Sequence, residues 1–176
     1  MTVTPHFTGQ PVVAYLCAGS NIGDKPANCR KGIDALVNTA KTRLAALSRF
    51  YRTEPVDYAD QDWFVNVVAK VVTTETPLAL LERLKTIEVE TGRQAGGIRF
   101  GPRVLDLDIL FYGDRVIDTA ELVVPHPRMH KRHFVLKPFC DIDPAIVHPT
   151  LQRTVQALLG DLDTTGQAVS VFSCDF

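Results

Sequence analysis

The chain has 176 residues, of which 45% are hydrophobic and 22% are charged, and its formal net charge is −1. Such a length and composition are typical of one globular domain, and a nearly neutral chain lacks the field that recruits nucleic acid or an anionic membrane. The four cysteines lack zinc or C-x-x-C spacing, and no apolar run approaches the roughly 18 residues of a membrane span. We expect a single domain over residues 1–176 in a soluble, cytoplasmic protein without a signal peptide.

The first half of the chain alternates between strand and helix patterns. Residues 12–18 are apolar and partly β-branched and end at a Gly-Ser-Asn turn, which indicates a buried strand. Asp24 is a suitable N-cap for the amphipathic helix that follows, whose apolar residues recur at helical spacing. Residues 44–51 and 63–73 have strand patterns, and the loop between them is rich in Asp.

The next segments are a second helix and another strand. Thr76 as N-cap, Pro77 in the first turn and Gly92 after the last turn bracket the helix. Residues 104–112 are strand-like, and the following Gly-Asp pair predicts a hairpin with residues 115–117 as the partner strand.

The last fifty residues are rich in Pro and His and predict short helices at 129–139 and 154–159, with an edge strand at 169–172. In the core, the order is strand, helix, strand, strand, helix, strand. This order predicts an α+β sandwich in which two helices cover one face of a mainly antiparallel sheet.

Two acidic side chains mark the strand at 104–112. Because side chains alternate along a strand, Asp106 and Asp108 face one way and the odd-numbered apolar residues 105–111 face the other. Two carboxylates about 7 Å apart can bind a hard cation such as Mg²⁺. The simpler alternative is an edge strand whose polar face meets water.

A glycine-rich loop with three arginines, Arg93, Arg99 and Arg103, precedes this strand. Guanidinium groups bind phosphate oxygens in pairs, and the glycines allow the loop to close over a ligand. By itself, the loop fits equally well a solvated basic segment that pairs with surface acids. Together with the acidic pair, it has what binding of a polyphosphate with Mg²⁺ requires. The sequence therefore predicts a phosphoryl-transfer enzyme.

Three further side chains are candidates for phosphate or nucleotide contacts. Glu88 continues the apolar stripe of the second helix, where it can form an ion pair with Arg93 or contact a nucleotide. His126 and Arg132 belong to a basic segment without zinc-ligand spacing, and we expect them to donate to phosphate.

Phe64 and Asn66 place an aromatic ring and an amide on the same strand face. An amide offers donor and acceptor edges to a flat heterocycle, and an aromatic ring can stack on it. A core Phe beside a turn-capping Asn is the alternative.

Taken together, these segments resemble the 6-hydroxymethyl-7,8-dihydropterin pyrophosphokinase family of folate biosynthesis. The likeness covers about residues 12–150, and its most specific part is the run R-x-G-P-R-x-x-D-L-D-I-L. The resemblance implies a ferredoxin-like α+β fold. The segments that carry it are residues 18–21, 50–56, 60–66, 88–93, 99–110 and 124–129.

The resemblance implies transfer of pyrophosphate from ATP to the pterin hydroxymethyl group, with release of AMP. Asp106 and Asp108 would hold two Mg²⁺ ions along the triphosphate, and the metal or Asp108 would activate the attacking hydroxyl. Arg93 and Arg103 would stabilise charge on the group that is transferred. The implied ATP contacts are Glu88, Arg99, Arg103, Ile109, His126 and Arg132.

The resemblance also implies a pterin pocket, in which Phe64 and Phe134 sandwich the ring system. Asn66 and the backbone of Thr53 and Val56 would read the hydrogen-bonding edge, and Asp106 would contact the substrate as well. The protein's partners would then be its small-molecule substrates, ATP and the pterin. We expect it to bind neither nucleic acid nor membranes and to be a monomer. This sequence departs from many members at Phe100, where they have Trp, and at residues 94–97, which lack basic side chains.

Other classes fit less well. A two-metal phosphohydrolase would recruit further acids or histidines, and none has suitable spacing. A ferredoxin-like RNA-binding module would carry aromatic RNP1 residues and a basic surface. A small-molecule sensor would have no need for the acidic pair together with the arginine loop.

Overall fold

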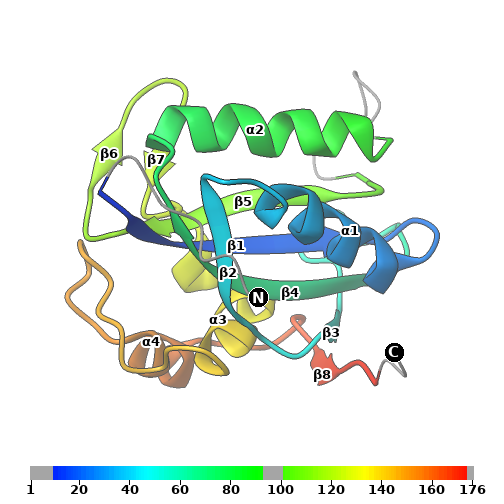
Figure 1. Cartoon of the computed structure of the whole chain (residues 1–176). Helices are drawn as coiled ribbons and strands as arrows, with labels where there is room; N and C mark the ends of the chain where they lie inside the picture. The colour runs from blue at the N-terminus through cyan, green and yellow to red at the C-terminus, as the bar shows by residue number, and fades with distance from the viewer. Residues whose placement is uncertain (1–9, 93–100, 174–176) are drawn as a thin grey trace.

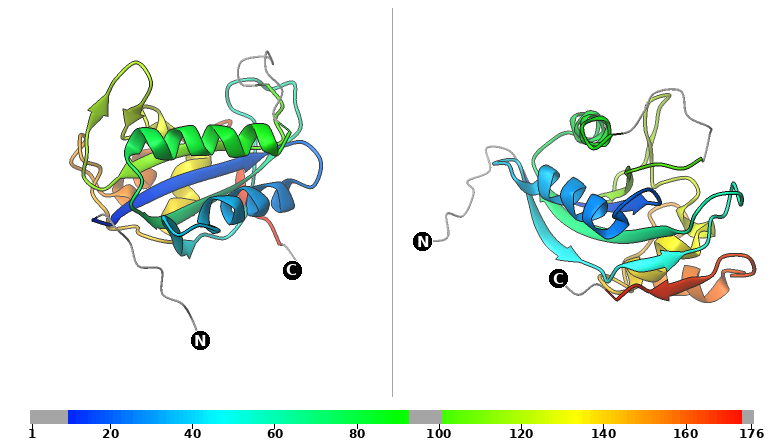
Figure 2. Two further views of the ribbon diagram at one scale, coloured as in Figure 1. Left: turned by 45° about the horizontal axis from the view of Figure 1, so that its top comes forward. Right: turned by 90° about the vertical axis from the view of Figure 1, so that its right-hand side faces the viewer.

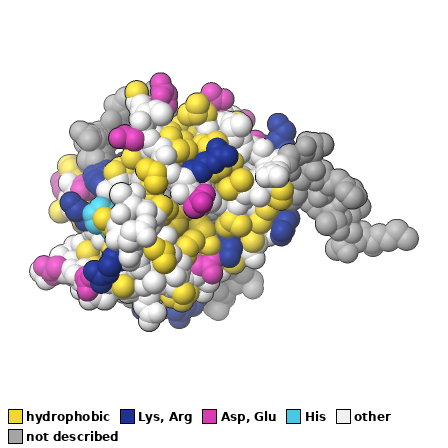
Figure 3. Space-filling view, turned by 90° about the vertical axis from the view of Figure 1, so that its left-hand side faces the viewer, with side chains coloured by type: hydrophobic (Ala, Val, Ile, Leu, Met, Phe, Trp, Pro, Cys, Tyr) yellow, Lys and Arg dark blue, Asp and Glu magenta, His cyan; other side chains and the backbone are white. Residues whose placement is uncertain are grey.

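The computed structural model of the protein describes residues 10–92 and 101–173. Within these ranges, every helix is too short or too polar to cross a membrane. On the face shown in Figure 3, acidic and basic side chains are interspersed among hydrophobic ones, as the nearly neutral composition predicts.

A six-stranded sheet forms the centre of the described structure (Figure 1). Its order is β5-β1-β4-β3-β8, β2 also pairs with β4, and every pairing is antiparallel. The segment expected as one strand at 44–51 is divided between β2 and β3, whereas the edge strand expected at 169–172 is confirmed as β8. The strands are β1 (Val12–Ser20), β2 (Thr42–Leu47), β3 (Tyr51–Thr53), β4 (Phe64–Thr73), β5 (Asp106–Tyr112) and β8 (Val169–Val171).

Helices cover both faces of the sheet (Figure 2). The helices α1 (Lys25–Val37) and α2 (Pro77–Glu90) pack on one face, as expected for a ferredoxin-like sandwich. The predicted N-caps are confirmed, since Asp24 and Thr76 each accept a hydrogen bond from a backbone N–H in the first turn. The opposite face carries the C-terminal additions: the 3₁₀ helix η1 (Met129–Lys131) and the helices α3 (His133–Cys140) and α4 (Val155–Asp161).

One expectation about β5 is wrong. Phe111 does not face the core under α1 and α2; it packs with Tyr15 and Phe139 in the second core, under α3 and α4. The cause is a register shift between β1 and β5, where Leu16 pairs with Ile109 but Tyr15 pairs with Phe111. A bulge of this kind inserts one residue and reverses the alternation beyond it.

The expected hairpin after β5 is also wrong. Gly113 does adopt a positive φ of 56°, as a tight turn requires. However, the next strand, β6 (Ile117–Asp118), pairs with β7 (Val123–Val124) in a separate two-stranded sheet instead of returning along β5. The pattern of residues 115–117 indicated a strand but did not identify its partner.

Candidate active site

The register of the sheet brings the predicted site residues together where β1 ends. Gly19 of β1 lies opposite Asp106 of β5 on one side and opposite Asn66 of β4 on the other. Phe64 of β4 pairs in turn with Thr53 of β3. A pocket opens at this end of the sheet, on the face that carries α3. The predicted site residues that line it are Thr53, Val56, Phe64, Asn66, Arg103, Asp106, Asp108, Arg132 and Phe134.

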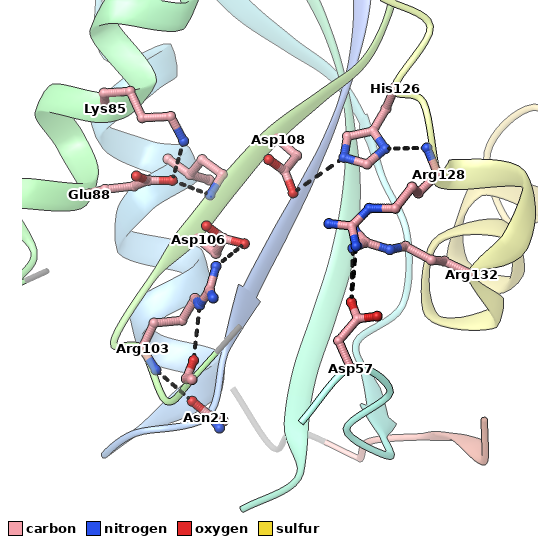
Figure 4. Close-up of polar contacts among 12 residues, drawn as sticks. Asn21, Asp57, Lys85, Glu88, Arg103, Asp106, Asp108, His126, Arg128 and Arg132 are labelled. Carbon is pink, nitrogen blue, oxygen red and sulfur yellow. Dashed lines mark hydrogen bonds and ion pairs between the residues drawn. The ribbon is translucent and has the colours of Figure 1, made fainter. Parts of the chain in front are cut away.

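The two carboxylates differ in their surroundings (Figure 4). Asp106 forms an ion pair with Arg103, with 2.8 Å between Arg103 Nη1 and Asp106 Oδ2. Within the described part of the chain, Asp108 has no arginine as close as this, and burial, together with repulsion from Asp106, raises its pKa to about 6. An acidic pair with such a surplus of negative charge fits a bound cation.

His126 lies beside Asp108, with 4.0 Å between Nε2 and the carboxylate Oδ2. The backbone N–H of Arg128 donates to Nδ1 over 3.2 Å. Burial, followed by the positive charges of Arg132 and Arg128, lowers the pKa of the ring to about 4. The imidazole is therefore neutral near pH 7, and because Nδ1 accepts a hydrogen bond, its proton is on Nε2, which faces Asp108.

The backbone of Arg103 is held by the turn after β1. Its N–H donates to Asn21 Oδ1 over 2.8 Å, and its carbonyl accepts from the Asn21 N–H over 3.1 Å. This double contact fixes the point at which the chain enters the site. Sequence reasoning treated the Gly-Ser-Asn segment as a weak turn motif and did not assign Asn21 a part in the site.

A second missed residue is Asp57, which lines the pocket from the loop between β3 and β4. Its Oδ2 lies 3.3 Å from Arg132 Nη2 and 3.4 Å from Arg128 Nη1 (Figure 4). The guanidinium of Arg132 also lies over the ring of Phe134, 5.3 Å from its centroid. In the sequence, Asp57 is one of several acids in the loop, and no local pattern sets it apart.

On the pterin side of the prediction, Asn66 is fixed by a neighbouring hydroxyl. Its Nδ2 donates to Thr53 Oγ1 over 2.7 Å, and both side chains are buried. This contact orients the amide so that Oδ1 lies toward Gly19. Because Phe64 and Asn66 line a pocket, their placement favours binding of a flat heterocycle over a core Phe beside a turn-capping Asn.

Three described residues that were predicted to contact ATP do not line the pocket: His126, which lies beside Asp108, and Ile109 and Glu88, which are buried elsewhere. Ile109 is 4% exposed in the core under α1 and α2. Glu88 is 1% exposed, and its Oε1 accepts from the Leu107 N–H over 2.7 Å and pairs with Lys85 Nζ over 3.0 Å. Glu88 therefore pairs with Lys85 and supports the strand that carries the acidic pair, whereas its expected partner Arg93 lies outside the described residues.

The remaining predictions concern residues that are not described. Arg93, Arg99, Phe100 and residues 94–97 lie outside the described ranges. Their proposed parts in catalysis and ATP binding stay predictions.

A carboxylate pair beside arginines, in the same pocket as two aromatic rings, has the chemistry that a phosphotransferase needs. The family model described as 7,8-dihydro-6-hydroxymethylpterin-pyrophosphokinase (HPPK) matches residues 15–144. The chain therefore belongs to the HPPK family, and it is a pyrophosphokinase of folate biosynthesis.

Individual relatives agree with this membership. The 2-amino-4-hydroxy-6-hydroxymethyldihydropteridine pyrophosphokinase of Bacillus subtilis is 42% identical over 74% of this chain and 77% of its own length. The folic acid synthesis protein fol1 of Schizosaccharomyces pombe is 38% identical over 88% of this chain, but the match spans only 21% of that longer protein. A crystal structure of Plasmodium falciparum HPPK-DHPS covers 87% of this chain and 46% of its own, with a TM-score of 0.68 at 16% identity, which supports the fold alone.

Proposed function

We propose that the enzyme transfers pyrophosphate from ATP to the hydroxymethyl group of 6-hydroxymethyl-7,8-dihydropterin, with two Mg²⁺ ions, and releases AMP. The observation that carries the proposal is one pocket with two chemically distinct sides. Asp106 and Asp108 lie beside the cations of Arg103 and Arg132, and the aromatic and amide groups line the same pocket.

The acidic pair suits Mg²⁺ in its number of ligands as well as its charge. Among the described residues, no group of three or more His, Cys, Asp or Glu side chains could enclose a metal. Mg²⁺ usually takes one or two carboxylates and completes its shell with water and substrate phosphates, so a pair is sufficient. Asp106 and Asp108 would hold the ions, which when bound would supply positive charge to neutralise the charge that develops on the phosphates.

The phosphate side depends on groups that carry protons or positive charge at neutral pH. Arg103 and Arg132 would neutralise phosphate oxygens that the metal leaves exposed. His126, neutral and protonated on Nε2, would donate a hydrogen bond without adding charge. In the reaction, the hydroxymethyl oxygen bonds to the β-phosphorus, the bond from that phosphorus to the bridging oxygen of AMP breaks, and Asp108 accepts the hydroxyl proton.

The pterin side would bind a flat, polar heterocycle. Phe64 and Phe134 supply the two faces, since both line the pocket, one from β4 and one from α3. One N–H of Asn66 Nδ2 donates to Thr53, which fixes the amide, and Oδ1 would accept from a ring N–H. Backbone groups of Thr53 and Val56 would complete the edge.

A test of the metal and phosphate roles is AMP formation from ATP, Mg²⁺ and the pterin by variants of two aspartates. We expect Asp108→Ala to stay folded by circular dichroism and to lose almost all AMP formation. The matched control Asp34→Ala, an exposed acid on α1, should keep wild-type activity. Normal turnover in Asp108→Ala would contradict the assignment.

The products distinguish the alternatives. ADP as product would indicate a simple kinase, and free phosphate would indicate the phosphohydrolase. We also expect Arg103→Ala to lower kcat more than it weakens ATP binding, because its charge is needed most when the phosphoryl group is transferred. A loss confined to ATP affinity would make Arg103 a binding residue only.

A further inference from the structure

The C-terminal segment lies behind the pocket, beyond the part of the chain that the family model matches. There β8 pairs with β3, with Val169 opposite Thr53 (Figures 1 and 2). One residue further along, Glu54 and Ala168 exchange two hydrogen bonds: the Glu54 N–H donates to the Ala168 carbonyl over 2.9 Å, and the Ala168 N–H donates to Glu54 Oε2 over 3.0 Å. The segment is therefore attached to the β3 wall of the pocket.

The preceding residue, Gln167, is bonded to the opposite wall, which is the start of α3. Gln167 Oε1 accepts from the His133 N–H over 2.9 Å, and the Gln167 carbonyl accepts from His133 Nδ1 over 2.8 Å. Its Nε2 donates to the Lys131 carbonyl over 3.2 Å. Two consecutive residues, Gln167 and Ala168, thus bind one wall each.

The contact with α3 supplies a cap that the helix itself lacks. The first N–H groups of a helix have no partner within it and usually bond to the side chain of the N-cap residue. Here the N-cap is Arg132, which makes no side-chain cap, because a guanidinium has no acceptor. Gln167 provides the acceptor from 34 positions away, while the Arg132 side chain, 11% exposed, lines the pocket instead.

We propose that Gln167 is a positioning residue for the active site: it holds the start of α3, and with it Arg132 and Phe134, at a fixed distance from the β3 wall. This inference rests on the proposed function only for the identity of the ligand. Gln167 is absent from the residues that line the pocket, so it acts through residues of α3. Phe134 belongs to the first turn that Gln167 caps, so its stacking face depends on that turn.

The test compares Gln167→Ala with Gln167→Glu, which keeps an acceptor for the His133 N–H. The control is Gln156→Ala, a change at an exposed glutamine of α4. Hydrogen exchange reports on the helix start directly, and steady-state AMP formation reports on the site. For Gln167→Ala, we expect faster exchange at residues 133–136 and a KM for the pterin raised about three- to tenfold, the order of effect of a lost cap. The kcat at saturating pterin should stay within about twofold, and Gln167→Glu should lie closer to the wild type.

The outcomes separate the two proposals. Unchanged exchange at residues 133–136 in Gln167→Ala overturns the positioning role whatever the ligand is. Faster exchange with an unchanged pterin KM in an active enzyme overturns it too, because the cap would then serve stability alone. A wild-type enzyme that makes no AMP refutes the proposed function, while the exchange data still decide whether Gln167 fixes the start of α3.

Discussion

Replacing Gly19 by Ala should damage pterin binding through a neighbour and not through a direct contact. Gly19 separates the two halves of the pocket, between Asp106 and Asn66 in the sheet register. Its backbone is compatible with Ala, since it is absent from the positive-φ glycines. A Cβ built there, however, would lie 2.4 Å from Asn66 Oδ1. Ordinary van der Waals contact begins at 3.4 Å, so the amide must retreat by about 1 Å to reach it.

The size of the effect follows from the bond that holds the amide. A 1 Å displacement of Asn66 is incompatible with its 2.7 Å bond to Thr53 Oγ1. Leaving a buried polar group without its partner costs about 1–3 kcal/mol. We expect the free energy of unfolding to fall by about that amount. Because Asn66 would also present Oδ1 in the wrong place, the pterin affinity should fall about tenfold or more, at about 1.4 kcal/mol for each factor of ten.

Isothermal titration with the pterin, in the presence of Mg²⁺ and a non-hydrolysable ATP analogue, measures the affinity, and urea unfolding measures the stability. Gly160→Ala is the matched control, because a Cβ at that position in α4 meets no atom within 4 Å. That variant should bind normally and unfold at equal or higher urea, since Ala favours a helix. Wild-type pterin affinity in Gly19→Ala would refute the reasoning, because it would mean that the amide does not read the substrate.

Two further changes test the support of the site and its charge balance. Glu88→Ala should lower the free energy of unfolding by about 2–3 kcal/mol, because it leaves the buried Leu107 N–H without an acceptor, and Glu88→Gln should recover most of that loss. Equal urea midpoints for the two variants would contradict this account. Asp57→Asn should tighten binding of the Mg²⁺–ATP analogue about two- to fivefold, the range of an exposed ion pair, because Arg132 no longer exchanges a carboxylate for phosphate. Asp60→Asn, in the same loop, should have no effect, and weaker nucleotide binding by Asp57→Asn would reverse the assigned role.

Local patterns were sufficient for most of the fold. The caps Asp24 and Thr76 and the apolar stripes depend on residues a few positions apart, so the sequence identified both main helices and the class of fold. The partner of β6 and the face of Phe111 were wrong because register and bulges depend on distant strands. No comparison tests the single-domain extent or the monomeric, cytoplasmic state, and these stay predictions.

The same division holds for the site. Arg103, Asp106 and Asp108 are close in sequence, so their shared chemistry was sufficient to predict a phosphate-binding side. Asn21 and Gln167 act through contacts with segments far along the chain. The residues next to them in the sequence give no sign of these contacts. Glu88 was predicted to contact a nucleotide because it is a charged residue on the apolar stripe of a helix. Its buried hydrogen bond from the Leu107 N–H gives a structural reason for that position.

The ion pairs in the pocket explain how several charged side chains can lie close together there. Arg103 is paired with Asp106 and Arg132 with Asp57, so both guanidiniums lie beside a carboxylate. In this partly exposed pocket, each pair keeps a guanidinium from losing solvation without a partner in return. With the proposed ligands, the partners would be exchanged: phosphate takes the guanidiniums, and Mg²⁺ takes the carboxylate that Arg103 leaves. Asp57 has no place in the metal site and, of its contacts within the described residues, would keep only the 3.4 Å one with Arg128 after this exchange, so its replacement by Asn should favour the nucleotide complex.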